Sequence, residues 1–314
     1  MDENSTLRPT YVQKADMATA QLTLGGKLVR EQVDNFIVVA IKEGKMLKLV
    51  RVTTISRDER EIPKMTTFGS RIWHAATEME ELPLAYRVRP GFDKVTITTA
   101  EMQAQVNFPK YFLKAQVEGP RFQQTMIAYL GLHSARDWDD KILNGDTTST
   151  DDLLALHDGM RAQMTTNTFA AGTAALSASI LDTTELTMPD EYAEQDGLAY
   201  FTSRRARAAY RREWQARIGN NADANILNNP PSSYGDIPIV VIPMIPTTLG
   251  VGANETVVLY LNPKQFVYAV EEDVELETEY SKKARMWSII MTARTGQNFE
   301  HEPATVQTDG VLST

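Results

Sequence analysis

Residues 58–98 read DEREIPKMTTFGSRIWHAATEMEELPLAYRVRPGFDKVTIT, and this stretch decides the fold. Two strand-like legs, Ile62–Ala76 and Phe92–Met102, flank a charged tip, Glu78–Gly91. Connections between elements of a compact domain are short, commonly about 4–6 residues, and two isolated strands are only marginally stable in water. We therefore predict an extended loop that leans on a neighbour, because the stretch is long and too weakly apolar to form its own core.

The composition is that of an ordinary folded protein of about two domains. The chain has 314 residues, of which 42% are hydrophobic and 23% charged, and single domains cluster near ~100–200 residues. It has no cysteine, which excludes disulfides, thiolate zinc sites, iron–sulfur clusters and cysteine nucleophiles. The longest apolar run, Ile237–Pro246, contains three prolines and is too short for a membrane-spanning helix of about 20 residues. We expect no membrane partner, and the polar Met1–Arg8 predicts no secretory signal.

The net charge is −9, from 32 basic and 41 acidic residues. Proteins that owe their affinity for DNA to phosphate contacts neutralise those phosphates with basic side chains, so the charge argues against a DNA-wrapping protein. It does not exclude a protein that encloses nucleic acid, because a like-charged wall keeps a polyanion mobile.

The N-terminal half contains arm-like, helical and strand-like segments. Residues 1–26 have no sustained period and predict an extended arm, whereas apolar spacing predicts a helix over Arg30–Gly44. Partial alternation over Met46–Ile55 predicts an edge strand. Gly119-Pro120 and Asn144-Gly145 are typical of a helix start and a helix end, so a long helix is predicted between them. A second helix is predicted after Thr150, with Leu153, Leu156, His157, Met160 and Met164 behind its cap.

The C-terminal half is richer in strands. Strands or apolar runs of strand length occupy Leu198–Thr202, Ile237–Ile245, Thr256–Leu261, Met286–Thr292 and Ala304–Val311. Asn220–Gly235 is predicted to be a loop.

Two segments concentrate charge of one sign. Ser203 is predicted to cap a helix that contains six arginines and one acid, Glu213. Glu271–Glu279 holds six acids and no base, and its alternation indicates a strand with an acidic face. Like charges along one face destabilise a strand unless cations lie opposite. The arginines therefore predict either a solvated surface or a contact between subunits with an acidic patch such as Glu275–Glu279.

No familiar catalytic signature is present, neither a glycine-rich phosphate loop nor a nucleophile elbow. The histidines are scattered through unlike contexts, at His74, His133, His157 and His301. Glu271, Glu272 and Asp273 could bind a divalent cation, although a solvated or salt-bridged face is the simpler interpretation. We predict no catalytic residue, no cofactor and no metal site.

Several segments carry a resemblance through their order and spacing: Gly25–Val33, Lys45–Val52, Ile142–Asp146, Tyr234–Val241 and Val270–Glu277. With this order of elements the chain resembles the major capsid proteins of tailed bacteriophages, which have the Hong Kong 97-type fold. The resemblance implies an α+β fold with an N-terminal arm, an extended loop, a peripheral domain built on a long spine helix, Pro120–Leu143, and an axial domain. It places the arm at residues 1–57, the loop at 58–98, the peripheral domain at 99–146 and 267–314, and the axial domain at 147–266.

The resemblance also implies a function, which is not enzymatic. Hexamers and pentamers of such subunits form an icosahedral shell around double-stranded phage DNA, which would touch the inner face weakly. The expected location is the virion capsid, assembled in the cytoplasm of the host bacterium, with a separate scaffolding protein, a portal and possible decoration proteins as partners. Some relatives join subunits by lysine–asparagine bonds. Lys64 lies in the loop, but Lys282–Trp287 offers no asparagine where one is expected, so we expect no covalent cross-link.

The charged residues of the loop tip, the arginine helix and the acidic strand are the predicted contacts between subunits. They are Glu78, Glu80, Glu81, Arg87, Arg89, Arg204, Arg205, Arg211, Arg212, Glu275, Glu277 and Glu279. Two other functions stay open: an encapsulin-like compartment with the same fold, and a two-domain enzyme that uses Glu271, Glu272 and Asp273 with a metal.

Overall fold

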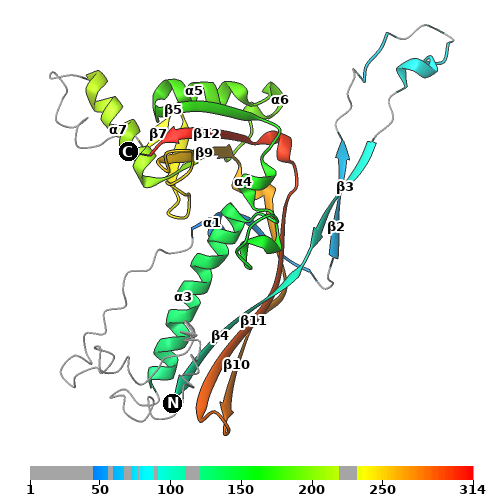
Figure 1. The fold of residues 1–314 in the computed structure, drawn as a ribbon. Coiled ribbons are helices and arrows are strands. Elements are labelled where there is room, and N and C mark those ends of the chain that lie inside the picture. The colour runs from blue at the N-terminus through cyan, green and yellow to red at the C-terminus, as the bar shows by residue number, and fades with distance from the viewer. Residues whose placement is uncertain are drawn as a thin grey trace, which may run out of the picture. The chain divides into compact units, whose positions relative to one another are not determined.

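A computed structural model of the chain describes residues 45–55, 59–66, 72–75, 78, 80–87, 91–109, 121–218 and 232–313 (Figure 1). The predicted arm over residues 1–26 and the predicted helix Arg30–Gly44 lie outside these residues, as does most of the predicted loop Asn220–Gly235. The chain divides into two compact units.

The described elements combine helices and strands, as an α+β fold requires. The helices are α1 (Met46–Leu49), α3 (Arg121–Asn144), α4 (Met160–Gln163), α5 (Ala178–Thr187), α6 (Asp190–Ala193) and α7 (Arg204–Ile218). The strands are β1 (Arg51–Thr54), β2 (Glu59–Thr66), β3 (Gly91–Thr98), β4 (Ala100–Pro109), β5 (Thr168–Ala175), β6 (Ala199–Thr202), β7 (Ser233–Tyr234), β8 (Ile237–Val241), β9 (Glu255–Leu261), β10 (Phe266–Ser281), β11 (Met286–Phe299) and β12 (Val306–Leu312). They form sheets in the orders β1-β10-β11-β4, β5-β12-β9-β6-β8-β7 and β2-β3.

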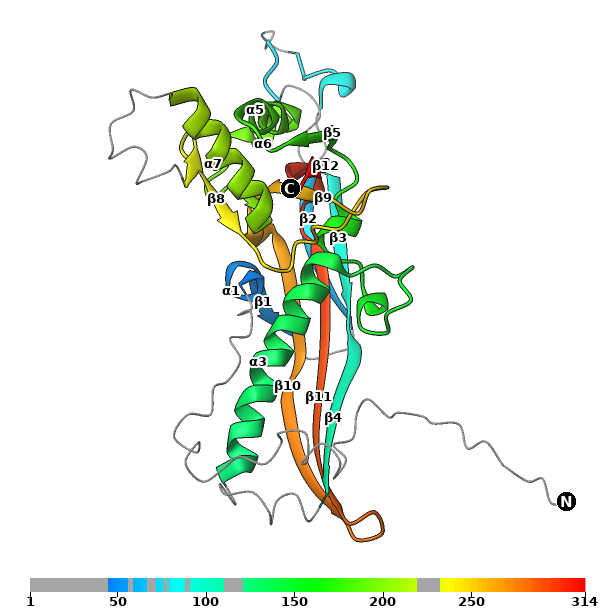
Figure 2. The same cartoon turned by 60° about the vertical axis from the view of Figure 1, so that its left-hand side comes forward.

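The first unit contains Glu101–His133 and Glu272–Ala293. In it β10 and β11 run side by side with β4, and β10 and β11 are joined by a tight turn (Figure 2). The acidic segment Glu271–Glu279 falls within β10, so its predicted strand is confirmed.

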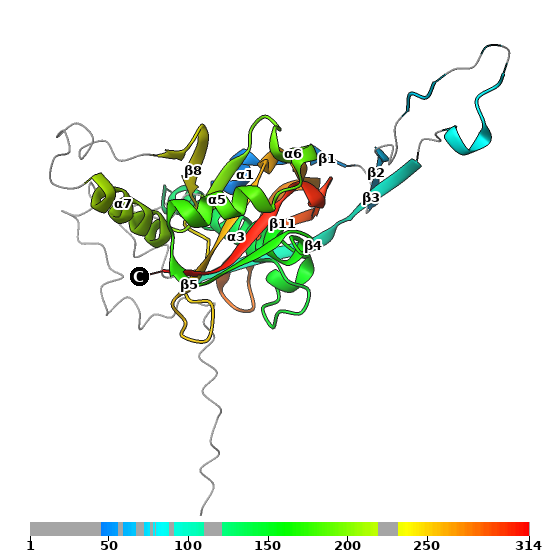
Figure 3. The same cartoon turned by 90° about the horizontal axis from the view of Figure 1, so that it is seen from above.

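The second unit contains Lys42–Ala100, Ser134–Glu271 and Arg294–Thr314, and it holds the six-stranded sheet. Its strand β9 is buried on both faces. Val257 and Leu259 belong to one hydrophobic cluster, whereas Val258 and Tyr260 belong to another. Since successive side chains of a strand point to opposite faces, the uninterrupted apolar run of β9 needs a cover on each side. Helix α5 supplies part of that cover, because it lies along β5 and β12 (Figure 3).

The segment Met46–Ile55 differs from its prediction in its first half. Strand β1 does lie at a sheet edge, pairing in parallel with β10 from Arg51↔Val267 to Thr54↔Val270. The residues before it form the short helix α1 instead. The reason is the carboxylate of Asp139 on α3, which accepts hydrogen bonds from the backbone N–H groups of Lys45, Met46 (3.0 Å) and Leu47 (2.9 Å). A cap supplied by a residue so distant in sequence leaves no local signal.

The predicted second helix after Thr150 is wrong. A 3₁₀ turn, Leu154–Leu156, and the short α4 replace it. The chain folds back on the end of α3, where the N–H of Gly159 donates to the carbonyl of Gly145 at 2.8 Å. A Cβ atom at Gly145 would lie 2.3 Å from a backbone oxygen, and one at Gly159 2.7 Å from a backbone nitrogen. This close approach of two glycines interrupts the helical stripe.

Strand β12 belongs to the six-stranded sheet. It pairs in parallel with β5 and antiparallel with β9, whereas the predicted boundary 267–314 put it with the peripheral strands. The other strands of that sheet all come from the predicted axial segment, 147–266. The partners of β12 are remote in sequence, so hydropathy alone could not choose between the two sheets. The domain boundaries stay predictions.

Several local predictions are confirmed. Helix α3 ends at Asn144, and α7 begins after Ser203, whose Oγ accepts a hydrogen bond from the N–H of Ala206 at 3.3 Å. Strands β6 and β9 match the predicted apolar segments. None of the described helices is long and apolar enough to cross a membrane.

Candidate functional site: the β2–β3 hairpin and the charged surfaces

Strands β2 and β3 form the two legs of the predicted extended loop. They pair antiparallel from Glu59↔Thr98 to Thr66↔Gly91, and among the described strands they form a two-stranded sheet of their own. The legs are shorter than predicted, since the apolar segment Phe92–Met102 is divided between β3 and β4. A two-stranded ribbon of this kind depends on contacts at its base or with another molecule.

The base of the hairpin is fixed to the second unit. Ile62 packs against a small cluster of Ile55, Ile97, Val267 and Ala269, all of which are buried. Polar contacts reinforce this base. The Nη1 of Arg60 donates to Thr53 Oγ1 at 2.8 Å, and the Nδ2 of Asn298 donates to the carbonyl of Thr96 at 2.9 Å.

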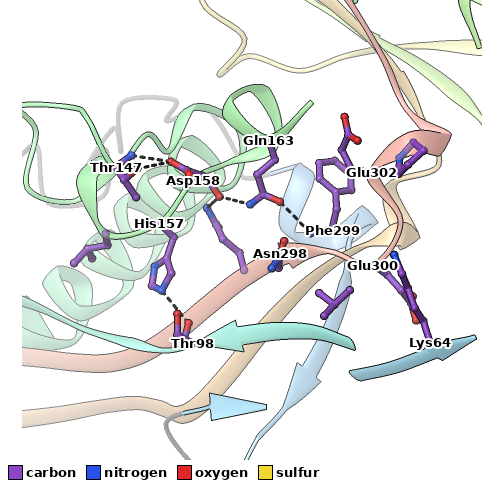
Figure 4. A pocket seen from close by; sticks show the side chains of 14 residues that line it. Lys64, Thr98, Thr147, His157, Asp158, Gln163, Asn298, Phe299, Glu300 and Glu302 are labelled. Atoms are coloured by element: carbon purple, nitrogen blue, oxygen red, sulfur yellow. Dashed lines mark hydrogen bonds between the residues drawn. The ribbon is translucent and has the colours of Figure 1, made fainter. Parts of the chain in front are cut away.

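A polar cleft of about 540 Å³ lies beside this base (Figure 4). Figure 4 shows His157 pointing to Thr98, whose carbonyl lies 2.9 Å from Nε2. Burial, helped by the positive charge of Lys141, lowers the pKa of His157 to about 4. The ring is therefore neutral at physiological pH, and Nε2–H donates to the carbonyl. Asp158 accepts hydrogen bonds from the N–H and the Oγ1 of Thr147, at 2.8 and 2.9 Å.

The outer part of the hairpin exposes large apolar side chains. Trp73 is 90% exposed, Phe92 76% and Leu84 72%. Ile72, Leu82 and Tyr86 are exposed as well. Apolar side chains gathered on one projecting element mark an interaction surface more often than a solvated one. The sequence prediction missed this feature, because it singled out the charges of the tip; the signal it could have used is the apolar residues that interleave those charges.

The predicted charges of the tip are partly paired within the tip itself. Arg87 Nη2 lies 2.8 Å from Glu81 Oε2, and Arg87 Nε donates to the carbonyl of Leu82 at 2.9 Å. Glu78 and Glu80 are exposed, and Arg89 lies outside the described residues. The ring of His74 stacks on that of Tyr86, with centroids 4.6 Å apart. The contacts of Arg87 hold the turn of the tip in shape, and its predicted role between subunits stays a prediction.

Four arginines of α7 form one exposed face. The buried side of the helix carries Ala206, Ala209 and Tyr210. The exposed side carries Arg204, Arg205, Arg211 and Arg212. The acid of this helix, Glu213, accepts a hydrogen bond at 2.9 Å from the N–H of Ala178, the first residue of α5. On β10, Glu277 and Glu279 are exposed, while the side chain of Glu275 lies outside the described residues.

The acids suggested as metal ligands have other contacts where they are described. The carboxylate of Glu271 accepts a hydrogen bond from the hydroxyl of Thr99 and lies 3.3 Å from Arg294 Nη1. The side chains of Glu272 and Asp273 lie outside the described residues. In the part of the chain that the structure describes, no group of three histidine or acidic side chains is placed to hold a metal ion.

Comparison with known proteins finds a relative by sequence and several solved structures with a similar fold. No protein-family model matches the chain. A predicted prophage capsid protein, YqbE of Bacillus subtilis (strain 168), is 28% identical over 302 residues, which cover 93% of this chain and 95% of the relative.

Solved structures match over nearly the whole length. The capsid of the native GTA particle has a TM-score of 0.67 at 14% identity and covers 98% of this chain and 99% of its own. A chain of Gordonia phage Cozz gives 0.64 at 13% identity, with the same coverage. The holo-SrpI encapsulin of Synechococcus elongatus PCC 7942 gives 0.61 at 12% identity, covering 96% of this chain and 97% of its own. This likeness shows that the chain shares its fold with all three.

Proposed function

We infer that the chain is a bacteriophage major capsid protein with the Hong Kong 97-type fold, a structural protein and not an enzyme. Copies of it assemble into the shell of the virion. One observation carries the mechanism: the β2–β3 hairpin has its base in the second unit and its exposed apolar side chains beyond that base. Exposing these apolar side chains to water is unfavourable in free energy. A neighbouring copy that covers them removes this unfavourable term.

The energetics favour assembly through many contacts of moderate strength. Burying one large apolar side chain completely stabilises a contact by about 1.5–3 kcal/mol, and Trp73, Leu84 and Phe92 are all available. A subunit in a closed shell touches several neighbours at once, so the apparent affinity exceeds that of each interface. Obligate interfaces commonly bury on the order of 2,000–5,000 Å².

The finer details of the assembly belong to the same proposal. The subunits form hexamers and pentamers of an icosahedral shell around double-stranded DNA, and assembly takes place in the cytoplasm of the host bacterium. A net charge of −9 suits a wall that touches packaged DNA weakly. A separate scaffolding protein and a portal complete the head. The charged residues of the tip and the arginine face of α7 remain the proposed contact surfaces, with decoration proteins as possible outer partners.

An encapsulin-like compartment is the second candidate, and one observation favours it: an encapsulin shares the fold at a TM-score of 0.61. Fold likeness alone does not separate the two functions. The relative at 28% identity is a prophage capsid protein, which favours the phage head. Particles purified with the neighbouring genes expressed should contain DNA, whereas a protein cargo in place of DNA would favour the compartment.

The test of the hairpin uses two polar substitutions, Trp73→Ser and Leu84→Ser, in one chain. We expect the variant to stay folded but to sediment as free subunits or capsomers, and negative-stain images should show no shells. The matched control is Leu186→Ser, because Leu186 is 77% exposed on α5, outside the hairpin. Normal shells from the double variant would show that the hairpin does not carry assembly.

A further inference from the structure

The turn between β10 and β11 presents a cluster of positive charge. The strands are neighbours in their sheet and are joined by residues 282–285 (Figure 2, orange). Strands with so short a connection run antiparallel. Lys282, Lys283 and Arg285 are all exposed in this turn. The N–H of Ala284 donates to Ser281 Oγ at 3.3 Å and Arg285 has a φ of 53°, so a defined backbone presents the three cations.

The stem of the same hairpin presents negative charge. Glu277 and Glu279 are two residues apart in β10 and both are exposed, so they project from the same face of the strand. Tyr280 projects from the other face, where its ring lies 5.0 Å from that of Trp287. This aromatic pair joins the two strands just before the turn and keeps the acids and the cations in a fixed order along the ribbon.

The two clusters do not neutralise each other within the chain. No ion pair joins any of these five charged side chains to another residue of the described ranges. Three to five residues along a strand separate Lys282 from the acids, which corresponds to about 10–17 Å. The Debye length at physiological ionic strength is about 8 Å. Among the residues that the structure describes, each cluster therefore keeps most of its charge uncompensated.

We propose that the cationic turn, Lys282, Lys283 and Arg285, binds the acidic stem, Glu277 and Glu279, of the same hairpin in a second copy of this chain. The inference rests on the proposed function, since a shell brings many copies together. One hairpin supplies both halves, so each copy gives its turn to one neighbour and receives the turn of another. Such a contact is heterologous, because it joins two different surfaces of the chain. Copies joined in this way form a closed ring or an open array, depending on the rotation that relates one copy to the next.

A second copy is the occupant that the charges favour. The chain carries −9 overall, so copies repel one another unless cations are placed where acids approach. The stem needs cations opposite it, because like charges in a row destabilise a strand. The arginine face of α7 is the competing partner of the stem. It is the weaker candidate because Arg212 and Glu213 of that helix already have interactions within the chain.

Charge exchange tests the pairing in the full-length chain. The turn variant is Lys282→Glu with Lys283→Glu, and the stem variant is Glu277→Lys with Glu279→Lys. For each, the fraction of protein in particles on a sucrose gradient should fall at least tenfold, with an unchanged circular dichroism spectrum. The variant with all four substitutions exchanges the two signs and should recover most of the particles.

A matched control separates pairing from net charge. It combines the turn variant with Asp152→Lys and Asp182→Lys, which restore the net charge at two exposed acids of the second unit. We expect no recovery. The inference is overturned if the turn variant makes normal shells, if the four-substitution variant recovers no better than this control, or if Arg204→Glu with Arg205→Glu rescues the stem variant instead. Absence of shells from the unchanged chain with its neighbouring genes would instead count against the proposed function.

Discussion

His157 shows how a single residue couples the fold to pH. Its ring is partly buried, and this burial, together with the positive charge of Lys141, lowers the pKa of His157 to about 4. Its Nε2–H donates to the carbonyl of Thr98 on β3. Lys141 is itself buried, donates to Thr295 Oγ1 at 3.0 Å, and has its pKa lowered to about 8 by that burial. The end of α3 and the base of the hairpin therefore share a site in which additional positive charge is unfavourable.

The first prediction concerns acid stability. Between pH 6.5 and about 4 the unfolded His157 binds a proton, whereas the folded ring does not. The free energy of unfolding therefore falls as pH is lowered through this window. Because the ring is only partly buried, we expect a contribution of about 1 kcal/mol. His157→Gln keeps a donor for Thr98 and removes the titration, so its loss of stability from pH 7 to 4.5 should be smaller.

The measurement is urea denaturation in the Trp73→Ser/Leu84→Ser background, in which assembly does not obscure unfolding. His133→Gln is the matched control, because His133 lies on α3, away from Thr98, and contacts Tyr129, with ring centroids 4.5 Å apart. Identical acid sensitivity of the His157→Gln variant and its parent would contradict the assignment.

At the scale of elements, sequence patterns predicted what local physics decides. The end of α3 at Asn144, the cap of α7 at Ser203 and the apolar run of β9 could all be predicted, because each signal lies within a few residues. Helix α1 could not, since its cap is the carboxylate of Asp139, which is 93 residues away from Met46. The helix expected after Thr150 failed because the contact of Gly145 with Gly159 outweighs a favourable apolar stripe.

The second prediction compares two glycines of the same region. Gly145→Ala would place Cβ 2.3 Å from the carbonyl oxygen of His157, so the backbone has to move, at a cost of about 1–3 kcal/mol or more. Gly131 lies inside α3 with no atom within 4 Å of an added Cβ. Gly131→Ala should therefore stabilise the helix by about 0.5–1 kcal/mol.

Urea midpoints of the two alanine variants in the same background measure the difference. Opposite signs are expected. A tolerated alanine at position 145 would mean that the close approach does not set the path of the chain after α3.

At the scale of the whole molecule, the sequence order identified the fold, and the candidate site was predicted only in part. The loop 58–98 was recognised from its length and polarity, and its strands are β2 and β3. The exposure of Trp73 and Phe92 was not anticipated, because a sequence pattern does not say which apolar residues lack a partner. Likewise, the sequence alone does not show that the acids of residues 277–279 lie in the stem of a hairpin and the cations of residues 282–285 in its turn. This arrangement follows only from the pairing of β10 with β11.

The last prediction follows Trp73 during assembly. Its side chain is 90% exposed in the single subunit, so its fluorescence should be red-shifted and readily quenched by acrylamide. If a neighbouring copy covers the hairpin, shell formation should shift the emission to the blue and reduce quenching, because the indole leaves water. Trp73→Phe keeps an aromatic side chain and should assemble without most of that change. Trp138→Phe is the control, since Trp138 packs near Tyr268, with ring centroids 6.3 Å apart, and should leave the change intact. Equal quenching of Trp73 in subunits and in shells would mean that this side chain stays in solvent, and the neighbour would then have to bind the hairpin elsewhere.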